Sequence, residues 1–156
     1  MWSKLKPYII SILIALGVGG LSALLTSGNM NNDFIAPPLS PPPVLFPIVW
    51  TVLYTLMGIS VALVYEKGKE ENIDISSALG IYLIQLAVNF FWSIIFFNMQ
   101  AYLFAFIWII LLWILIITMI KRFYEISPSA AYLQIPYLLW VTFAAYLNLA
   151  IYILNR

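Results

Sequence analysis

Long apolar runs alternate with short polar segments along this chain. Five runs contain no charged residue, and each has the roughly 20 residues that a helix needs to cross a hydrocarbon core of about 30 Å. They cover residues 8–27, 44–65, 76–97, 101–120 and 130–153. The segments between them carry charges or helix breakers, as in "EKGKEENID" and "KRFYEISPS". The pattern predicts a single domain over residues 1–156, an all-α integral membrane protein folded as a bundle of five transmembrane helices.

The composition agrees with a membrane protein and limits its chemistry. Apolar residues make up 64% and charged residues 8% of the chain, which is too apolar for a soluble globule of 156 residues. The chain has neither cysteine nor histidine, so it lacks the thiolates and imidazoles of zinc sites, nucleophile pairs and haem ligation. We therefore expect no metal site. The charge-free runs also argue against an ion-coupled carrier, which keeps ionisable groups inside its bundle.

Basic residues are distributed unevenly between the two sides of the predicted membrane domain. Six of the seven precede the first run or lie in the second and fourth separators: Lys4, Lys6, Lys67, Lys69, Lys121 and Arg122. By the positive-inside rule, we expect a multi-pass protein of the cell membrane with its N-terminus cytoplasmic and its C-terminus outside. A secretory signal is the alternative for the first run, but the run is long for one and four more follow, so we expect a retained helix.

Three of the predicted helices carry polar and aromatic side chains along one face. At about 100° per residue, the aligned residues are Pro47, Trp50 and Tyr54 in the second run, Tyr82, Gln85, Asn89 and Trp92 in the third, and Gln134, Tyr137, Ala144 and Asn148 in the fifth, with Trp140 on the flank. Polar side chains of membrane helices face the protein interior, where partners exist. The three faces predict a shared site suited to a large, flat and mostly apolar ligand.

A structural role is the alternative for each of these residues taken alone. Asn89 and Asn148 also fit plain interhelical hydrogen bonds, and the three tryptophans also fit core packing. The convergence of three such faces favours the site. In contrast, Trp108 and Trp113 lie on the fourth run without polar neighbours, so we expect them to pack or to face lipid.

The first run has a face of small residues. Ser11, Ala15, Gly19 and Ala23 recur every four residues, a spacing that lets another helix backbone approach closely. The partner is either a neighbouring helix, which we favour, or a second copy of the chain.

The first separator is rich in proline, with six prolines in "PPLSPPPVLFP". Residues 28–43 are expected to form a stiff, extended lid over the mouth of the bundle, because a stiff segment loses little entropy when it closes. Pro43 is expected in the first turn of the second helix and Pro47 at a kink. The alternative is that the prolines merely end one helix and start the next.

Three segments resemble the signature segments of a known family. They are "PPVLFPIVWTVLY" at 42–54, "QLAVNFFWSIIFF" at 85–97 and "PYLLWVTFAAYLN" at 136–148. They are similar to those of the tryptophan-rich sensory protein family, also called the translocator protein or peripheral-type benzodiazepine receptor family. The resemblance covers almost the whole chain. Many relatives have a tryptophan at the position of Val44, so the rim of the site is less aromatic here.

The resemblance implies a pocket that opens toward the first loop and binds tetrapyrroles, or drug-like apolar ligands of isoquinoline carboxamide or benzodiazepine type. It also implies a homodimer in the lipid bilayer, no required cofactor, and light-dependent breakdown of protoporphyrin in bacterial relatives. No nucleic-acid partner is expected. By position, Trp50, Asn89, Trp140 and Ala144 match pocket residues of the family.

These observations lead to one functional hypothesis and one alternative. We expect a membrane protein that binds protoporphyrin, as ligand or substrate, and promotes its light-dependent degradation, with Trp50 and Trp140 as the catalytic residues. The expected ligand-binding residues are Pro47, Trp50, Tyr54, Gln85, Asn89, Trp92, Tyr137, Trp140, Ala144 and Asn148. The alternative is a transporter or sensor of tetrapyrroles or similar apolar ligands without a catalytic role, and whether the protein is an enzyme is left open.

Overall fold

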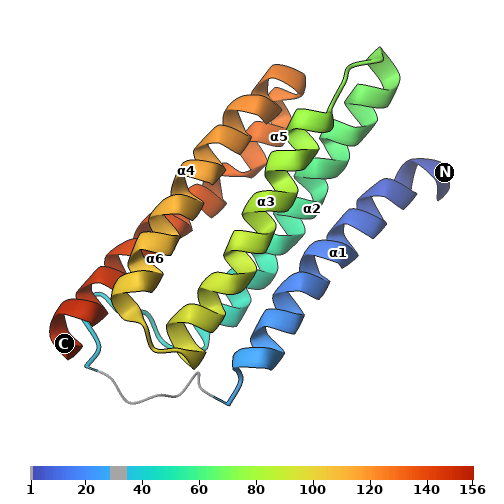
Figure 1. The fold of residues 1–156 in the computed structure, drawn as a ribbon. Helices are drawn as coiled ribbons and strands as arrows, with labels where there is room; N and C mark the ends of the chain where they lie inside the picture. Colours follow the sequence, from blue (N-terminus) through green and yellow to red (C-terminus); the bar gives the residue numbers. More distant parts are fainter. Residues whose placement is uncertain (1, 29–34) are drawn as a thin grey trace.

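The computed structural model describes residues 2–28 and 35–156, and that part of the chain is helical apart from its connections (Figure 1). Its helices are α1 (Trp2–Thr26), α2 (Leu45–Glu71), α3 (Ser76–Ser93) with the π-helical turn η1 (Ile94–Asn98), α4 (Tyr102–Ile126), α5 (Pro128–Leu133) and α6 (Ile135–Asn155). Within the described ranges, five stretches are long and apolar enough to cross a membrane: α1, α2, α3 with η1, α4, and α5 with α6. The predicted class, an all-α membrane protein of five spanning helices, is confirmed. Residues 29–34 of the predicted lid lie outside the described residues.

The spans lie side by side as a bundle, with the chain termini at opposite ends (Figure 1). α1 packs on α2, α4 lies between α3 and α6, and α5 packs against both α2 and α4. α3 and α6 run in the same direction. We call the end that carries residues 35–44 and the C-terminus the strap end, and the end that carries the loops 67–75 and 121–128 the basic end. Because backbone groups in lipid must be paired within the chain, charge-free apolar segments of this length settle as helices.

The small-residue face of α1 packs against α2. Ala15 is fully buried, and a Cβ at Gly19 would collide with the ring of Tyr54 on α2. The two helices also approach closely at Gly58 of α2, where an added Cβ would collide with the backbone of α1. Ala23, the fourth residue of this face, is exposed. The structure thus favours the neighbouring helix as the partner of this face over a second copy of the chain.

The fifth span is broken near its start. The sequence predicts one continuous helix over 130–153, but the chain turns at Gln134, between α5 and α6. Pro136 explains the break, because its ring has no N–H for the carbonyl four residues earlier and clashes with it. α5 itself begins at Pro128, where the Ser127 hydroxyl caps the helix by accepting from a backbone N–H.

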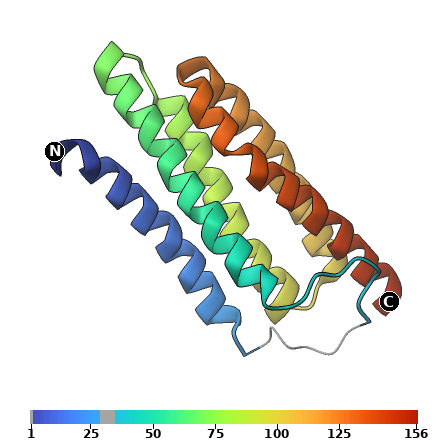
Figure 2. The ribbon, with the colours of Figure 1, turned by 180° about the vertical axis from the view of Figure 1, so that it is seen from behind.

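Residues 35–44, here called the strap, cross the strap end of the bundle from α6 to the start of α2 (Figure 2). Two side chains of α6 hold the strap. The Tyr146 hydroxyl donates to the Pro38 carbonyl at 2.8 Å. The Asn155 amide accepts from the Ile35 N–H at 2.7 Å and donates to the Ile35 carbonyl at 3.1 Å. The described part of the predicted lid is therefore fixed across the bundle rather than extended into solvent.

A tight turn in the middle of the strap sets its shape. Leu39 has a φ of 70°, which non-glycine residues rarely adopt, and it follows Pro38, whose fixed φ suits the preceding turn position. The Ser40 hydroxyl donates to the Pro37 carbonyl at 2.8 Å and closes the turn.

The prolines at the start of α2 differ from the expectation. Pro43 lies before the helix rather than in its first turn, because α2 begins at Leu45. Pro47 is the third residue of α2, where a backbone N–H has no acceptor within the helix in any case. Pro47 therefore helps to start the helix, and no hydrogen bond is lost that would produce a kink.

Candidate functional site

A ladder of hydrogen bonds joins the polar faces of α2, α3 and α6 inside the bundle. The Tyr54 hydroxyl donates to Asn89 Oδ1 at 3.1 Å, and Asn89 Nδ2 donates to the Tyr137 hydroxyl oxygen at 2.7 Å. The Tyr137 hydroxyl in turn donates to Gln85 Oε1 at 2.7 Å. All four side chains are buried, so each bond replaces one that lipid cannot offer. We call these four residues the ladder.

A second hydrogen-bonded group lies nearer the strap end. Trp92 Nε1 donates to Asn148 Oδ1 at 3.0 Å, and Asn148 Nδ2 donates to the Tyr102 carbonyl at 2.8 Å. The indole of Trp92 also stacks on Phe96 of η1, with ring centroids 5.1 Å apart. These contacts tie α3, α4 and α6 together beside the π-helical turn.

Aromatic rings adjoin the ladder between α2 and α6. Trp50 lies 5.5 Å from Tyr54 and 6.3 Å from Tyr137, measured between ring centroids, and meets Tyr137 edge to face. Trp140 meets Phe46 of α2 edge to face at 5.7 Å. Phe46 is a contact that the sequence analysis did not name, although it lies one turn before Trp50 on the same face of α2. α2 and α6 thus meet here through rings.

The remaining predicted residues have less defined roles. Pro47 is exposed. Ala144 is buried, at 8% exposure, and belongs to the main apolar core. The structure therefore brings eight of the ten predicted ligand-binding residues into the polar and aromatic contacts described above, and leaves Pro47 and Ala144 outside them.

Several buried polar atoms near the ladder have no hydrogen-bond partner among the described residues. They are Tyr82 Oη, Gln85 Nε2, both polar side-chain atoms of Gln134, and Trp140 Nε1. Trp140 Nε1 can only donate, so it is a donor open to a ligand beside the rings. The sequence placed Tyr82 and Gln134 on the polar faces but gave neither a role.

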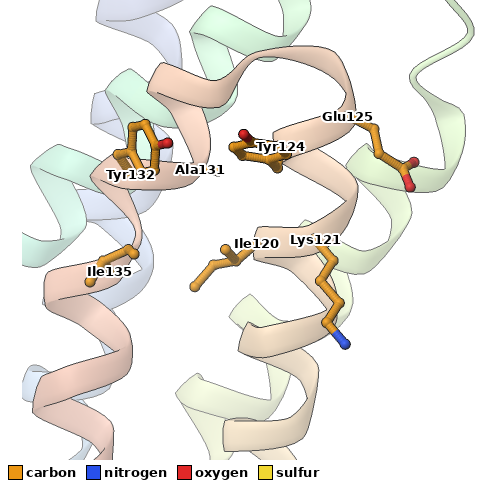
Figure 3. Close-up of a pocket in the computed structure, with 7 residues that line it drawn as sticks. All are labelled: Ile120, Lys121, Tyr124, Glu125, Ala131, Tyr132 and Ile135. Atoms are coloured by element: carbon orange, nitrogen blue, oxygen red, sulfur yellow. The ribbon is translucent and has the colours of Figure 1, made fainter.

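Two surface hollows in the described part of the chain lie away from the ladder. One, of about 420 Å³, opens near the basic end between α4 and the α5–α6 break, where Ile120 and Ile135 face each other across it (Figure 3). The other, of about 470 Å³, lies at the strap end beside Tyr102 and Tyr152. Between α2 and α6 the rings of Trp50 and Tyr137 are in contact, so a flat ligand that enters between them would have to part them.

The two tryptophans of α4 differ from the expectation that they lack polar partners. Trp108 Nε1 donates to the Val88 carbonyl of α3 at 2.7 Å, and Trp113 Nε1 donates to the Thr142 hydroxyl of α6 at 2.8 Å. Both partners lie on neighbouring helices, which is why the sequence of α4 gave no sign of them. Their role is to hold α3, α4 and α6 together.

The site offers phenols, amides and indoles. None of these groups is an ordinary general acid or base near neutral pH, and within the described ranges no three carboxylates come together as metal ligands. The arrangement is suited to binding a flat apolar molecule by ring stacking, with hydrogen bonds to its polar edges.

Comparison with known proteins identifies the family. Residues 10–154 match the TspO/MBR family. The chain is similar to the tryptophan-rich protein TspO of Archaeoglobus fulgidus, with 36% identity over 94% of this chain and 95% of that protein. Its identity with the tryptophan-rich protein TspO of Chlorobaculum tepidum is 41%, over 80% of this chain and 78% of that one. The translocator protein of Ovis aries is 33% identical over 72% of this chain and 66% of its own length. This five-helix membrane protein therefore belongs to the TspO/MBR family.

Proposed function

We propose that the protein binds a tetrapyrrole, protoporphyrin in the first instance, between α2, α3 and α6 and promotes its light-dependent degradation. The observation that carries the proposal is the direct contact between the aromatic rings and the ladder. Trp50 touches Tyr54 and Tyr137, which are themselves ladder residues. A porphyrin has the matching chemistry, because it combines a broad π-face with polar edges.

The absence of charge inside the spans, together with the position of the rings toward the strap end, favours one orientation of the ligand. Apart from the helix ends, the spans carry no basic side chain, and an ionised carboxylate inside an uncharged bundle is costly. The two propionates would therefore lie toward the strap end, where water and the terminal Arg156 are near. The apolar face of the ring would lie between Trp50 and Trp140, and the buried Trp140 Nε1 would donate to an acceptor on the ligand.

Access to the site would require movement at the strap end. α2 and α6 meet through side-chain rings near that end, whereas α5 packs on α2 near the basic end. Rings can change rotamer without breaking backbone hydrogen bonds, so the strap end can open while the basic end stays closed. The strap lies across this opening and is held by Tyr146 and Asn155.

The light-driven step would draw on the pigment and on tryptophan. An excited porphyrin can accept an electron from a neighbouring indole, with dioxygen as the final oxidant, or pass its energy to dioxygen directly. Trp50 and Trp140 are the indoles placed to react, and they are catalytic residues in this proposal. The protein supplies orientation and a confined site, and no further cofactor is needed.

The alternative function is transport or sensing of tetrapyrroles or similar apolar ligands, with degradation incidental. One relative is named a translocator protein, which favours this reading. Drug-like apolar ligands would compete for the same rings. A homodimer in the bilayer fits either function.

The two functions are separated by illuminating the purified protein with protoporphyrin. Quenching of tryptophan fluorescence in the dark reports binding, and porphyrin absorbance under light reports degradation. We expect saturable binding, followed by light-dependent loss of porphyrin that a competing isoquinoline carboxamide suppresses. Saturable binding with no more loss than free porphyrin shows would favour the transporter or sensor. Absence of saturable binding would overturn both.

A further inference from the structure

Three side chains at the lower edge of the ladder, toward the basic end, carry buried polar atoms without a hydrogen-bond partner among the described residues: Tyr82, Gln85 and Gln134. Tyr82 precedes Gln85 by three residues on α3, and Gln134 precedes Tyr137 by three residues at the start of α6. Side chains at this spacing share a helix face. Because α3 and α6 run in the same direction and Gln85 bonds Tyr137 across the gap, Tyr82 and Gln134 are carried to the same level. Tyr82 is 4% exposed, and Gln85 and Gln134 are fully buried.

The hydrogen bonds of the ladder all point the same way, from Tyr54 toward Gln85, and they leave the Gln85 Nε2 donor unused. Tyr54 donates to Asn89, Asn89 to Tyr137, and Tyr137 to Gln85. Gln85 therefore accepts with its oxygen, and its Nε2 must donate onward. Within the described ranges Gln85 Nε2 finds no acceptor, and the amide of Gln134 finds neither donor nor acceptor.

The occupant that satisfies these atoms must be small, neutral, and able both to donate and to accept. An unpaired amide inside an apolar interior destabilises the fold, so several unpaired polar atoms at one level need a hydrogen-bond partner. A charged ligand is unsuitable because the spans beside it carry no Asp, Glu, Lys or Arg that could neutralise it. Water meets each requirement, since it commonly makes about three hydrogen bonds when buried and needs little space.

We propose that Tyr82, Gln85 and Gln134 form an internal hydration site, in which bound water bridges the two amides and the phenol. The water accepts from Gln85 Nε2 and donates to Gln134 Oε1, and Tyr82 completes its coordination. The hydrogen-bonded chain then runs from Tyr54 through the ladder and the water to the start of α6. The water is a structural part of the bundle, and the two residues replaced in its test, Tyr82 and Gln134, are not among the expected ligand-binding residues, so the test does not depend on the proposed function.

Thermal unfolding of three variants tests the site through the sign of the change in melting temperature. Tyr82→Phe removes one oxygen and keeps the ring stacked on Phe123, and Gln134→Met keeps the length of the side chain without its amide. If water links these residues, each variant melts lower by about 2–4 °C. The double variant then falls by less than the sum of the two, because both residues lose the same water. Tyr132→Phe, at an exposed tyrosine near the basic end, is the control and should not change the melting temperature.

The opposite results would overturn the hydration site. If the atoms are unpartnered, Gln134→Met removes a buried and unpaired amide, and the melting temperature rises or stays level. Additive effects of the two substitutions would also contradict a shared water. A crystal structure that resolves ordered water supplies the direct check: we expect density within hydrogen-bonding distance of Gln85 Nε2, and its absence would refute the site. Both measurements are made without ligand. A result that refutes the hydration site therefore says nothing about porphyrin binding, and a result that refutes porphyrin binding says nothing about the hydration site.

Discussion

At the scale of single residues, Asn89 has the central position in the interior. Its amide accepts from Tyr54 and donates to Tyr137, so one side chain links α2, α3 and α6. Periodicity predicted that Asn89 and Tyr137 face inward, because polar groups in a membrane bundle need partners. It gave no pairing, since partners 35 and 48 residues apart are set by how the helices tilt and pack.

Replacing Asn89 should therefore loosen three helices at once. We expect Asn89→Leu to lower the free energy of unfolding by about 1–3 kcal/mol, because the Tyr54 hydroxyl loses its acceptor, the Tyr137 hydroxyl loses one donor, and interhelical bonds in membranes contribute modestly. Unfolding in detergent, followed by circular dichroism, measures the effect. Thr118→Val is the matched control, because Thr118 bonds only the carbonyl one turn back in its own helix. If Asn89→Leu is as stable as the wild type, the ladder does not stabilise the bundle.

At the scale of elements, the strap is the part of the fold that sequence described least completely. Its proline content predicted a stiff segment, and the turn at Leu39 shows how that stiffness is shaped. The anchors on α6 were not predicted, because Tyr146 and Asn155 lie more than 100 residues from their partners in the sequence. Pro136 could have indicated the break at Gln134, but the residues on both sides are apolar, and the sequence was therefore interpreted as one continuous helix.

Loss of the anchors should change how fast ligand leaves, with little effect on the bundle. We expect Tyr146→Phe combined with Asn155→Leu to raise the dissociation rate of protoporphyrin several-fold, because three hydrogen bonds hold the strap to α6. Stopped-flow fluorescence measures the rate. Tyr152→Phe, on the same helix and outside these bonds, is the control. An unchanged rate in the double variant would mean that the strap does not cover the site.

Stiffness of the strap can be tested separately from its anchors. Glycine at Pro37, Pro38, Pro41 and Pro42 should weaken porphyrin affinity while the helices stay folded, because a more flexible strap loses more entropy when it is ordered. Equilibrium titration compares the variant with the wild type, and circular dichroism checks the helix content. Unchanged affinity would return these prolines to the simpler role of separating two helices.

At the scale of the whole molecule, hydrophobic length fixed the number of spans. It did so because each apolar run matches the thickness of the hydrocarbon core, and the helices then extend a few residues past the expected limits, as α2 does to Glu71. The length of an apolar run does not predict tertiary contacts. It therefore could not predict the helix ends, the turn η1 or the close approach of α1 to α2.

Orientation in the membrane stays a prediction from charge. The basic end carries six of the seven Lys and Arg residues, so we expect that end in the cytoplasm and the strap end outside. A reporter that is active only outside the cytoplasm should be active when it is fused after Arg156, and a reporter that is active only in the cytoplasm should be inactive there. A cytoplasmic signal would mean that the predicted orientation is wrong and that the strap end faces the cytoplasm.

The central claim is that the rings between α2 and α6 bind the porphyrin and react with it. The most direct measurement compares Trp50→Phe and Trp140→Phe with Trp2→Phe, an exposed tryptophan at the far end of α1. Phenylalanine keeps an apolar ring, so dark binding should weaken by about 1 kcal/mol, roughly fivefold in affinity. Indole is much easier to oxidise than a phenyl ring, so the light-driven loss of bound porphyrin should fall far more than binding does, while Trp2→Phe matches the wild type. Unchanged binding and unchanged degradation in both Trp50→Phe and Trp140→Phe would contradict the account and place the site elsewhere.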